Sequence, residues 1–136
     1  MLQIRPTTIK DYKELCDWWQ WHRFPKPPVE LLDYLKYGLM VHSADQNICA
    51  GFLYFTNARQ FGLLEYVVST YKVKDKIVRK EALKVLILGL QKVAKNNGVE
   101  VLFSSLRNEP LIKTYQDCGF VIGSKNTTEM ICKLQY

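Results

Sequence analysis

The chain has 136 residues, of which 48% are hydrophobic and 24% are charged, and its formal net charge at pH 7 is +6. This length predicts a single domain over residues 1–136 that buries roughly 68% of the unfolded chain's surface, and it excludes two ordinary domains. No run of about 18 apolar residues is present, and the N-terminus lacks the apolar core of a signal peptide. The sequence therefore predicts a protein without a membrane partner, located in the cytoplasm.

The cysteines and histidines show no metal-binding pattern. The four cysteines are scattered without a Cys-x-x-Cys pair, and the two histidines add no spacing typical of a metal site. We expect four reduced thiols and no metal.

The first half of the chain predicts a strand, two helical segments and a meander of three strands. Residues 2–4 alternate as a short strand, and Thr7 or Thr8 is a suitable cap for the helix that follows. A cluster of three prolines at 25–28 ends that helix, and residues 29–35 form a further helical turn or two. The strands of the meander are expected at 39–42, 48–56 and 61–69.

The second half predicts alternating helices and strands. Apolar residues recur at helical spacing from about 76 to 97, and Asn97-Gly98 ends this long helix. A buried strand at 99–106, a short helix at 110–118 and strands at 120–122 and 129–134 follow. The order β-α-α-β-β-β-α-β-α-β indicates an α/β fold with a mixed sheet, antiparallel in its centre and parallel across the long helix.

The most informative motif lies at residues 108–120. Asn108 is suited to cap a helix, Pro110 to stand in its first turn, and Gly119 to end it before Phe120. This strand-cap-helix-cap unit is also compatible with any α/β protein. An Asn, a Tyr seven residues later, and Gly-Phe four and five residues beyond that resemble the end of an acyl-CoA N-acyltransferase domain of the GNAT superfamily. The predicted order of elements is also similar to the GNAT fold over nearly the whole chain.

The resemblance implies acetyl-CoA as the acyl donor. In this family the pantetheine arm follows a strand edge, which here implies Tyr66, Val67 and Val68. Ser104 and Ser105 are expected across a gap from this edge, and Asn108 at the next helix. Unpaired backbone groups at such an edge are good partners for the two amides of the arm. An ordinary buried strand pair is the alternative.

The expected pyrophosphate site departs from the family pattern. The family places glycines at the start of the long helix, but residues 63–88 contain none, and Arg79, Ala82 and Lys84 stand at the signature positions. Residues 71–84 hold six basic and two acidic residues, a surplus of four positive charges that attracts phosphate. We expect Arg79, Lys80 and Lys76 to replace backbone contacts with charged side chains, the alternative being weakened or lost CoA binding.

Two residues are candidates for proton transfer. The resemblance implies that Tyr115 donates a proton to the departing thiolate, and packing in the core is its alternative role. Glu65 interrupts an apolar strand, so partial burial would raise its pKa into the range of a general base. An outward-facing Glu on a half-exposed strand is equally compatible. Glu129 and His42 are weaker candidates because nothing in the sequence fixes them near the thioester.

The acceptor side is expected at the first two helices, where Trp19, Trp21 and Phe24 precede the prolines. Aromatic residues there form either a ligand wall or the covered edge of the core. Together with the proline-rich connection, they resemble compact GNAT-like proteins of phages and bacteria.

Three functions remain open from the sequence. The first is an acetyl-CoA-dependent N-acetyltransferase acting on a primary amine of a small molecule or protein, as a monomer or homodimer. The second is a GNAT-like binding module that has lost catalysis. The third is a nucleic-acid-associated protein that uses the basic segment, which is disfavoured because no nucleic-acid motif accompanies it.

Overall fold

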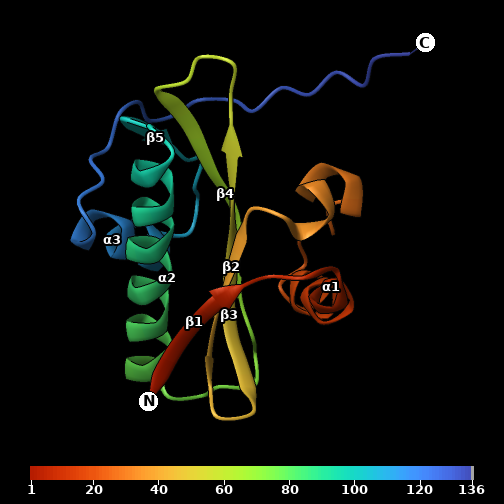
Figure 1. Ribbon diagram of the computed structural model, residues 1–136, viewed down its shortest axis with the longest axis vertical. Coiled ribbons are helices and arrows are strands. Elements are labelled where there is room, and N and C mark those ends of the chain that lie inside the picture. Colours follow the sequence, from red (N-terminus) through yellow and green to blue (C-terminus); the bar gives the residue numbers. More distant parts are fainter. Residues whose placement is uncertain (136) are drawn as a thin grey trace.

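A computed structural model describes residues 1–135 as one five-stranded sheet with helices on both faces (Figure 1). Helices α2 and α3 cover one face, and α1 and η2 cover the other. The elements are β1 (Leu2–Pro6), η1 (Ile9–Asp11), α1 (Tyr12–Trp21), η2 (Val29–Leu35), β2 (Gly38–Ser43), β3 (Gln46–Phe55), β4 (Phe61–Ser69), α2 (Lys76–Asn96), β5 (Val101–Phe103) and α3 (Glu109–Asp117).

The sheet order β1-β2-β3-β4-β5 contains both expected pairing modes. Strands β1 to β4 pair antiparallel, whereas β4 and β5 run parallel and are connected through α2. The mixed α/β sheet predicted from the sequence is therefore confirmed. None of the helices in residues 1–135 combines the length and apolar character that crossing a membrane requires.

Two predicted strands were wrong, and a third was predicted too long. Residues 120–122 and 129–134 form no strand, because no neighbouring strand supplies hydrogen bonds to them. The strand expected at 99–106 is limited to β5, since β4 and β5 diverge after three paired residues. The helical segment expected at residues 29–35 is confirmed as η2, which is of the 3₁₀ type and in which Asp33, Tyr34 and Leu35 have positive φ angles.

Helix boundaries follow the predicted end signals. The side chain of Asn108 accepts a hydrogen bond from the Leu111 N–H at 3.0 Å at the start of α3. Helices α2 and α3 are followed by Gly98 and Gly119, whose φ angles of 85° and 99° favour glycine. Local sequence therefore sets where these helices begin and end.

Two apolar clusters hold the helices on the sheet. On the α1 side, Trp18 and Trp19 pack with Phe52 of β3, and on the α2 side Leu86 and Leu90 pack with Tyr115 of α3. Each large buried side chain contributes about 1.5–3 kcal/mol through removal of apolar surface from water. Tyr115 thereby fixes α3 beside the strands that form the site.

Candidate active site

A bulge in β4 shapes the site. Between the pairs Ala50–Val68 and Phe52–Glu65, β3 contributes only Gly51 whereas β4 contributes Tyr66 and Val67. Tyr66 has a φ angle of 58°. A bulge of this kind bends its strand and increases the local twist, so β4 turns away from β5 at this point.

The divergence of β4 from β5 opens a gap at Glu65. Parallel pairing covers only Phe61–Leu63 with Val101–Phe103. Beyond it, Ser104 Oγ donates a hydrogen bond to the Leu64 carbonyl, and the Ser105 N–H donates to Glu65 Oε1 at 2.8 Å. Within residues 1–135, β4 then has no strand partner on this side at Tyr66, Val67 and Val68. The three predicted backbone positions therefore lie on a free edge, and their assignment to a cofactor stays a prediction.

The carboxyl of Glu65 is half-buried in this gap. Burial raises its pKa from the ordinary 4.5, and the nearby Glu129 raises it further, while hydrogen bonds from Ser105 and Ser104 act in the opposite direction. Burial raises the pKa because it penalises the charged form, whereas donors to the carboxylate stabilise that form. The net upward shift moves Glu65 towards the range of a general base.

Tyr115 lies behind Ser104 and not at the surface. Its side chain is only 2% exposed, its ring contacts Phe120 with centroids 4.8 Å apart, and its hydroxyl lies 3.4 Å from Ser104 Oγ. Burial raises the pKa of Tyr115 above the ordinary 10. Ser104 Oγ is also 3.2 Å from Glu65 Oε1, so one hydroxyl connects the two proton-transfer candidates.

The N-terminal end of α2 is occupied by the protein's own carboxylate. Asp75 Oδ1 accepts hydrogen bonds from the N–H groups of Ile77 at 2.9 Å and Val78 at 3.4 Å. These are N–H groups that a helix offers to an anion. An aspartate just before a helix is a common cap, so the sequence already contained this signal.

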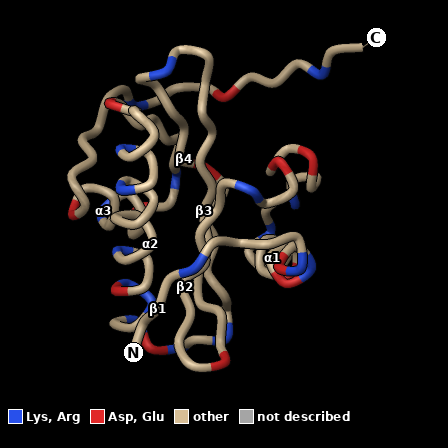
Figure 2. The backbone as a smooth tube through the Cα atoms, in the orientation of Figure 1, with Lys and Arg blue, Asp and Glu red and all other residues tan. Residues whose placement is uncertain are grey.

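Basic residues of α2 are partly engaged within the protein. Figure 2 shows Lys and Arg at successive turns of this helix. Arg79 Nη1 donates to the Val73 carbonyl at 3.0 Å and the Lys74 carbonyl at 3.4 Å, which fixes the preceding loop. Lys80 and Lys84 lie 3.8 and 3.6 Å from Asp117 of α3.

Other residues predicted at the phosphate site differ in accessibility. Lys76 is exposed at the start of α2, and Asn108 is exposed at the start of α3. Ala82 is fully buried against the sheet. Its small side chain therefore serves the packing of α2, and a bound ligand would not touch it in this conformation.

The aromatic residues expected on the acceptor side occupy three different environments. Trp19 is 1% exposed and belongs to the core, whereas Trp21 is 56% and Phe24 is 50% exposed. Phe24 lies edge-on to Tyr66, the residue after Glu65, with ring centroids 6.4 Å apart. Trp21 instead stacks on Tyr71 at 4.9 Å, at the far end of β4. Only Phe24 therefore lies against the β4 bulge with an exposed side chain.

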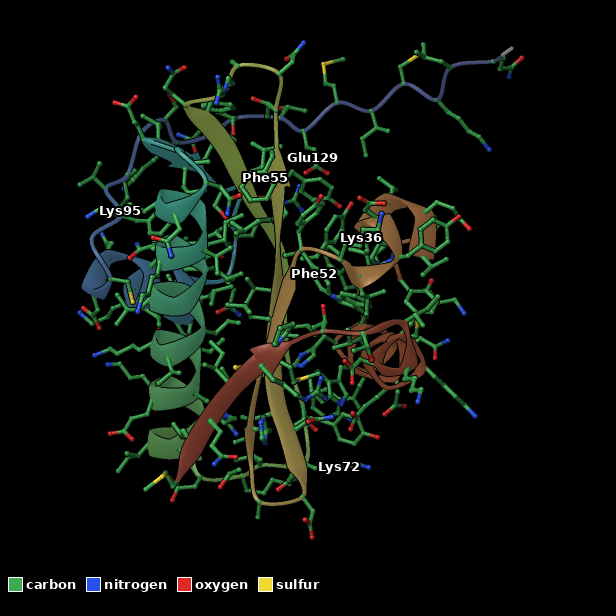
Figure 3. The ribbon with its side chains drawn as sticks, viewed as in Figure 1. Lys36, Phe52, Phe55, Lys72, Lys95 and Glu129 are labelled. Carbon is green, nitrogen blue, oxygen red and sulfur yellow. The ribbon has the colours of Figure 1, made fainter. Side chains whose placement is uncertain are left out.

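Glu129 is brought to the site by tertiary structure. It raises the pKa of both Glu65 and Tyr66, although burial is the larger cause in each case. Figure 3 shows Glu129 beside the upper part of the sheet, where the C-terminal segment crosses it. Nothing in the sequence fixed Glu129 near this site, because the two carboxylates lie 64 positions apart along the chain.

No protein-family model and no curated protein matches the sequence. Solved structures, in contrast, superpose on nearly the whole chain. TTHA1254 from Thermus thermophilus matches with a TM-score of 0.72 at 14% identity, covering 98% of this chain and 99% of that one. An acetyltransferase from Trypanosoma brucei matches with a TM-score of 0.66 at 15% identity, covering 96% and 100%.

A third match includes a bound cofactor. N-acetylglutamate synthase from Neisseria gonorrhoeae, complexed with coenzyme A and N-acetyl-glutamate, has a TM-score of 0.72 at 12% identity over 94% of this chain. This chain spans 30% of that larger protein. At such low identities the matches establish the fold, and they confirm the GNAT-like fold expected from the sequence.

Proposed function

We propose that the protein is an acyl-CoA-dependent N-acyltransferase that uses acetyl-CoA to acylate a primary amine of a small molecule or a protein. The observation that carries this proposal is the half-buried Glu65, held by Ser105 at the point where β4 and β5 diverge. A carboxyl with a raised pKa beside a free strand edge combines a base with a place for an extended ligand.

The residues of the site divide the chemistry between them. Acetyl-CoA supplies the acyl group as a thioester. Glu65 takes the proton that the amine nitrogen loses as its bond to the acyl carbon forms. Ser104 gives its hydroxyl proton to the departing sulfur and takes the hydroxyl proton of Tyr115 in its place, since Tyr115 itself is only 2% exposed and its oxygen lies 3.4 Å from Ser104 Oγ. The free backbone of Tyr66–Val68 and the polar groups of Ser104 and Asn108 would hold the donor.

The fit to the donor is better at the strand edge than at the phosphates. Lys76, Arg79 and Lys80 are the side chains we assign to the diphosphate. However, the N–H groups at the start of α2, which could otherwise bind the diphosphate, donate to the side chain of Asp75. Charged side chains bind phosphate well, so this arrangement supports binding that depends on lysine and arginine.

Calorimetry with acetyl-CoA, followed by a screen of amines for release of free thiol, tests the proposal. We expect saturable binding, a higher melting temperature through mass action, and amine-dependent thiol release. The absence of binding and of a thermal shift at about millimolar acetyl-CoA would contradict it.

A second candidate is a GNAT-like module that binds a partner without catalysis. The observation that favours it is Asp75, whose carboxylate occupies the position of a bound anion at the start of α2. Binding of acetyl-CoA without thiol release to any amine would support this module. The nucleic-acid alternative is weaker, because the basic residues lie where the diphosphate of the donor is expected and no nucleic-acid motif accompanies them.

A further inference from the structure

A small cavity lies between the η2 turn and β3, on the side of the sheet that α1 covers. Its volume of about 220 Å³ is below the roughly 300–1,000 Å³ of pockets that enclose drug-sized ligands, so it suits a small chemical group. Four aromatic side chains line it, namely Tyr37, Phe52, Tyr54 and Phe55. Of the described residues that line the cavity, Asp33 alone carries a charge.

The aromatic walls of this cavity are fixed by contacts within the protein. Tyr37 and Phe55 pack edge to face with ring centroids 5.3 Å apart, and the Tyr54 hydroxyl donates a hydrogen bond to the Leu31 carbonyl of η2. The faces of aromatic rings attract cations, and aromatic enclosures of this kind bind alkylammonium groups. Aromatic walls with one carboxylate therefore suit an ammonium group better than an anion.

Asp33 is held in an unusual backbone conformation. The φ angles of Asp33, Tyr34 and Leu35 are 47°, 54° and 65°, a left-handed run that residues other than glycine rarely form. Leu35 maintains this turn, because its side chain is fully buried and its carbonyl accepts a hydrogen bond from Thr7 Oγ1 at 2.7 Å. Backbone strain that the surrounding structure maintains is concentrated at ligand sites.

The carboxylate of Asp33 is available to a ligand. None of the ion pairs in residues 1–135 involves Asp33, although Lys36 is only three residues away. Glu65 of β4 adds negative charge from the other side, because after burial it contributes to the raised pKa values of both Tyr54 and Tyr66. A cleft with charges of one sign concentrates ligands of the opposite sign.

The cavity lies next to the proposed general base. Phe52, which lines it, is the cross-strand partner of Glu65. Directly opposite residues of an antiparallel pair have Cβ atoms roughly 5 Å apart, and each further residue along the strand adds about 3.4 Å. The stretch of β3 from Phe52 to Phe55, labelled in Figure 3, therefore extends from roughly 5 to roughly 11 Å away from Glu65. An alkyl chain of a few carbons spans this separation.

We propose that the cavity binds a second ammonium group of the acceptor, with Asp33 as its counter-ion, and that the acceptor is therefore a small linear diamine. The inference rests on the proposed function, because the other nitrogen is the one that is acylated beside Glu65. As the bond between that nitrogen and the acyl carbon forms, the bond from the acyl carbon to sulfur breaks and the amine proton passes to Glu65. The second nitrogen keeps its charge and stays with Asp33.

Calorimetry with putrescine, a linear diamine, on the full-length protein without an acyl donor tests the ammonium site. We expect saturable binding at low salt that Asp33→Asn weakens about tenfold or more, since a charged hydrogen bond is lost. Asparagine tolerates the left-handed conformation, and an unchanged melting temperature checks the fold of the variant. Glu30→Gln removes an exposed carboxylate of η2 that does not line the cavity and is the matched control. Putrescine that does not bind, or that binds equally well to Asp33→Asn, would overturn the proposal.

Thiol release from acetyl-CoA distinguishes this proposal from the proposed function. The KM for putrescine should be about tenfold or more below that for butylamine, which has the same carbon chain but one nitrogen. Asp33→Asn should raise the KM for putrescine with little change in kcat, and it should leave the KM for butylamine unaltered. Equal KM values for the two amines in the wild type would overturn the diamine specificity and leave acyl transfer intact. Putrescine binding that depends on Asp33, without thiol release, would contradict acyl transfer and retain the ammonium site.

Discussion

The gap between β4 and β5 and the N-terminal end of α2 lie along one expected path of the acyl donor, but they are built in different ways. At the gap, the Glu65 carboxylate and the β4 edge face an opening that no strand fills among the described residues. At α2, the helix N–H groups are taken by Asp75, and Arg79 is bound to its own loop. The bulge at the gap is formed without glycine, with Tyr66 at a φ angle of 58°, whereas a backbone phosphate site needs the close approach that glycines allow, and residues 63–88 contain none.

The largest effect is expected for substitution of Glu65 at the gap. Glu65→Gln keeps the acceptor oxygen for the Ser105 N–H but cannot take a proton, so the rate of acyl transfer should fall about a hundredfold or more. Because burial raises the pKa of Glu65, the acidic limb of the wild-type pH–rate profile should lie above pH 4.5 and disappear in the variant. Glu100→Gln, an exposed residue before β5, is the control. An unchanged profile would leave Glu65 with a structural role only.

The Tyr115→Phe variant tests the proposed proton donor at the same gap. Tyr115→Phe retains the packing against Phe120 but removes the hydroxyl near Ser104, so turnover should fall by about a hundredfold if this proton is transferred. Thermal melting should change little, since the 3.4 Å contact with Ser104 is long for a hydrogen bond. A large loss of stability with normal turnover would show that the hydroxyl serves the fold.

Arg79 distinguishes charge replacement at α2 from loop support. Arg79→Ala removes hydrogen bonds to the Val73 and Lys74 carbonyls, and it should lower the free energy of unfolding by about 1 kcal/mol. It should also weaken CoA binding by about 1–3 kcal/mol, measured by calorimetry. An acetyl-pantetheine analogue without the diphosphate is the control ligand. Equal losses for both ligands would mean that Arg79 acts only through the loop.

The Asp75→Asn variant tests whether the carboxylate of Asp75 weakens phosphate binding at the start of α2. Asp75→Asn keeps a good helix cap but removes the negative charge, so CoA should bind more tightly by about 0.3–1 kcal/mol. Calorimetry at low salt gives the largest difference, because salt screens the effect. Unchanged affinity would place the phosphates away from this end of the helix.

The smallest effect is on stability as a function of pH. The pKa of Glu65 is raised in the folded state, so the protonated carboxyl favours the folded state. Its contribution to the free energy of unfolding is fully present below the unfolded pKa and is lost as pH rises through the folded pKa. Glu65→Gln should therefore gain melting temperature relative to the wild type at about pH 7, and less at about pH 4. A difference that does not vary with pH would show that Glu65 titrates normally.

The residues of the two regions were predictable to different degrees. Glu65 was a candidate from the sequence because a carboxylate interrupts an apolar strand, and Asn108 was found because its capping signal is local. The burial of Tyr115 and Ala82 was not predictable, since helical spacing alone does not say which face meets the sheet. Trp19 and Trp21 are two residues apart, yet one is in the core and the other is exposed.

The sequence by itself determined the helices with their ends, the meander, and the parallel pair joined by α2, because periodicity and capping act over a few neighbouring residues. Tertiary structure decided that β4 separates from β5 at Glu65, that Ser104 connects Glu65 to Tyr115, and that Glu129 lies near both Glu65 and Tyr66. It also decided that residues 129–134 find no strand partner in their own chain, as far as residues 1–135 describe it. These features depend on groups far apart in the chain, and strand pairing is realised only where a neighbouring backbone provides the hydrogen bonds.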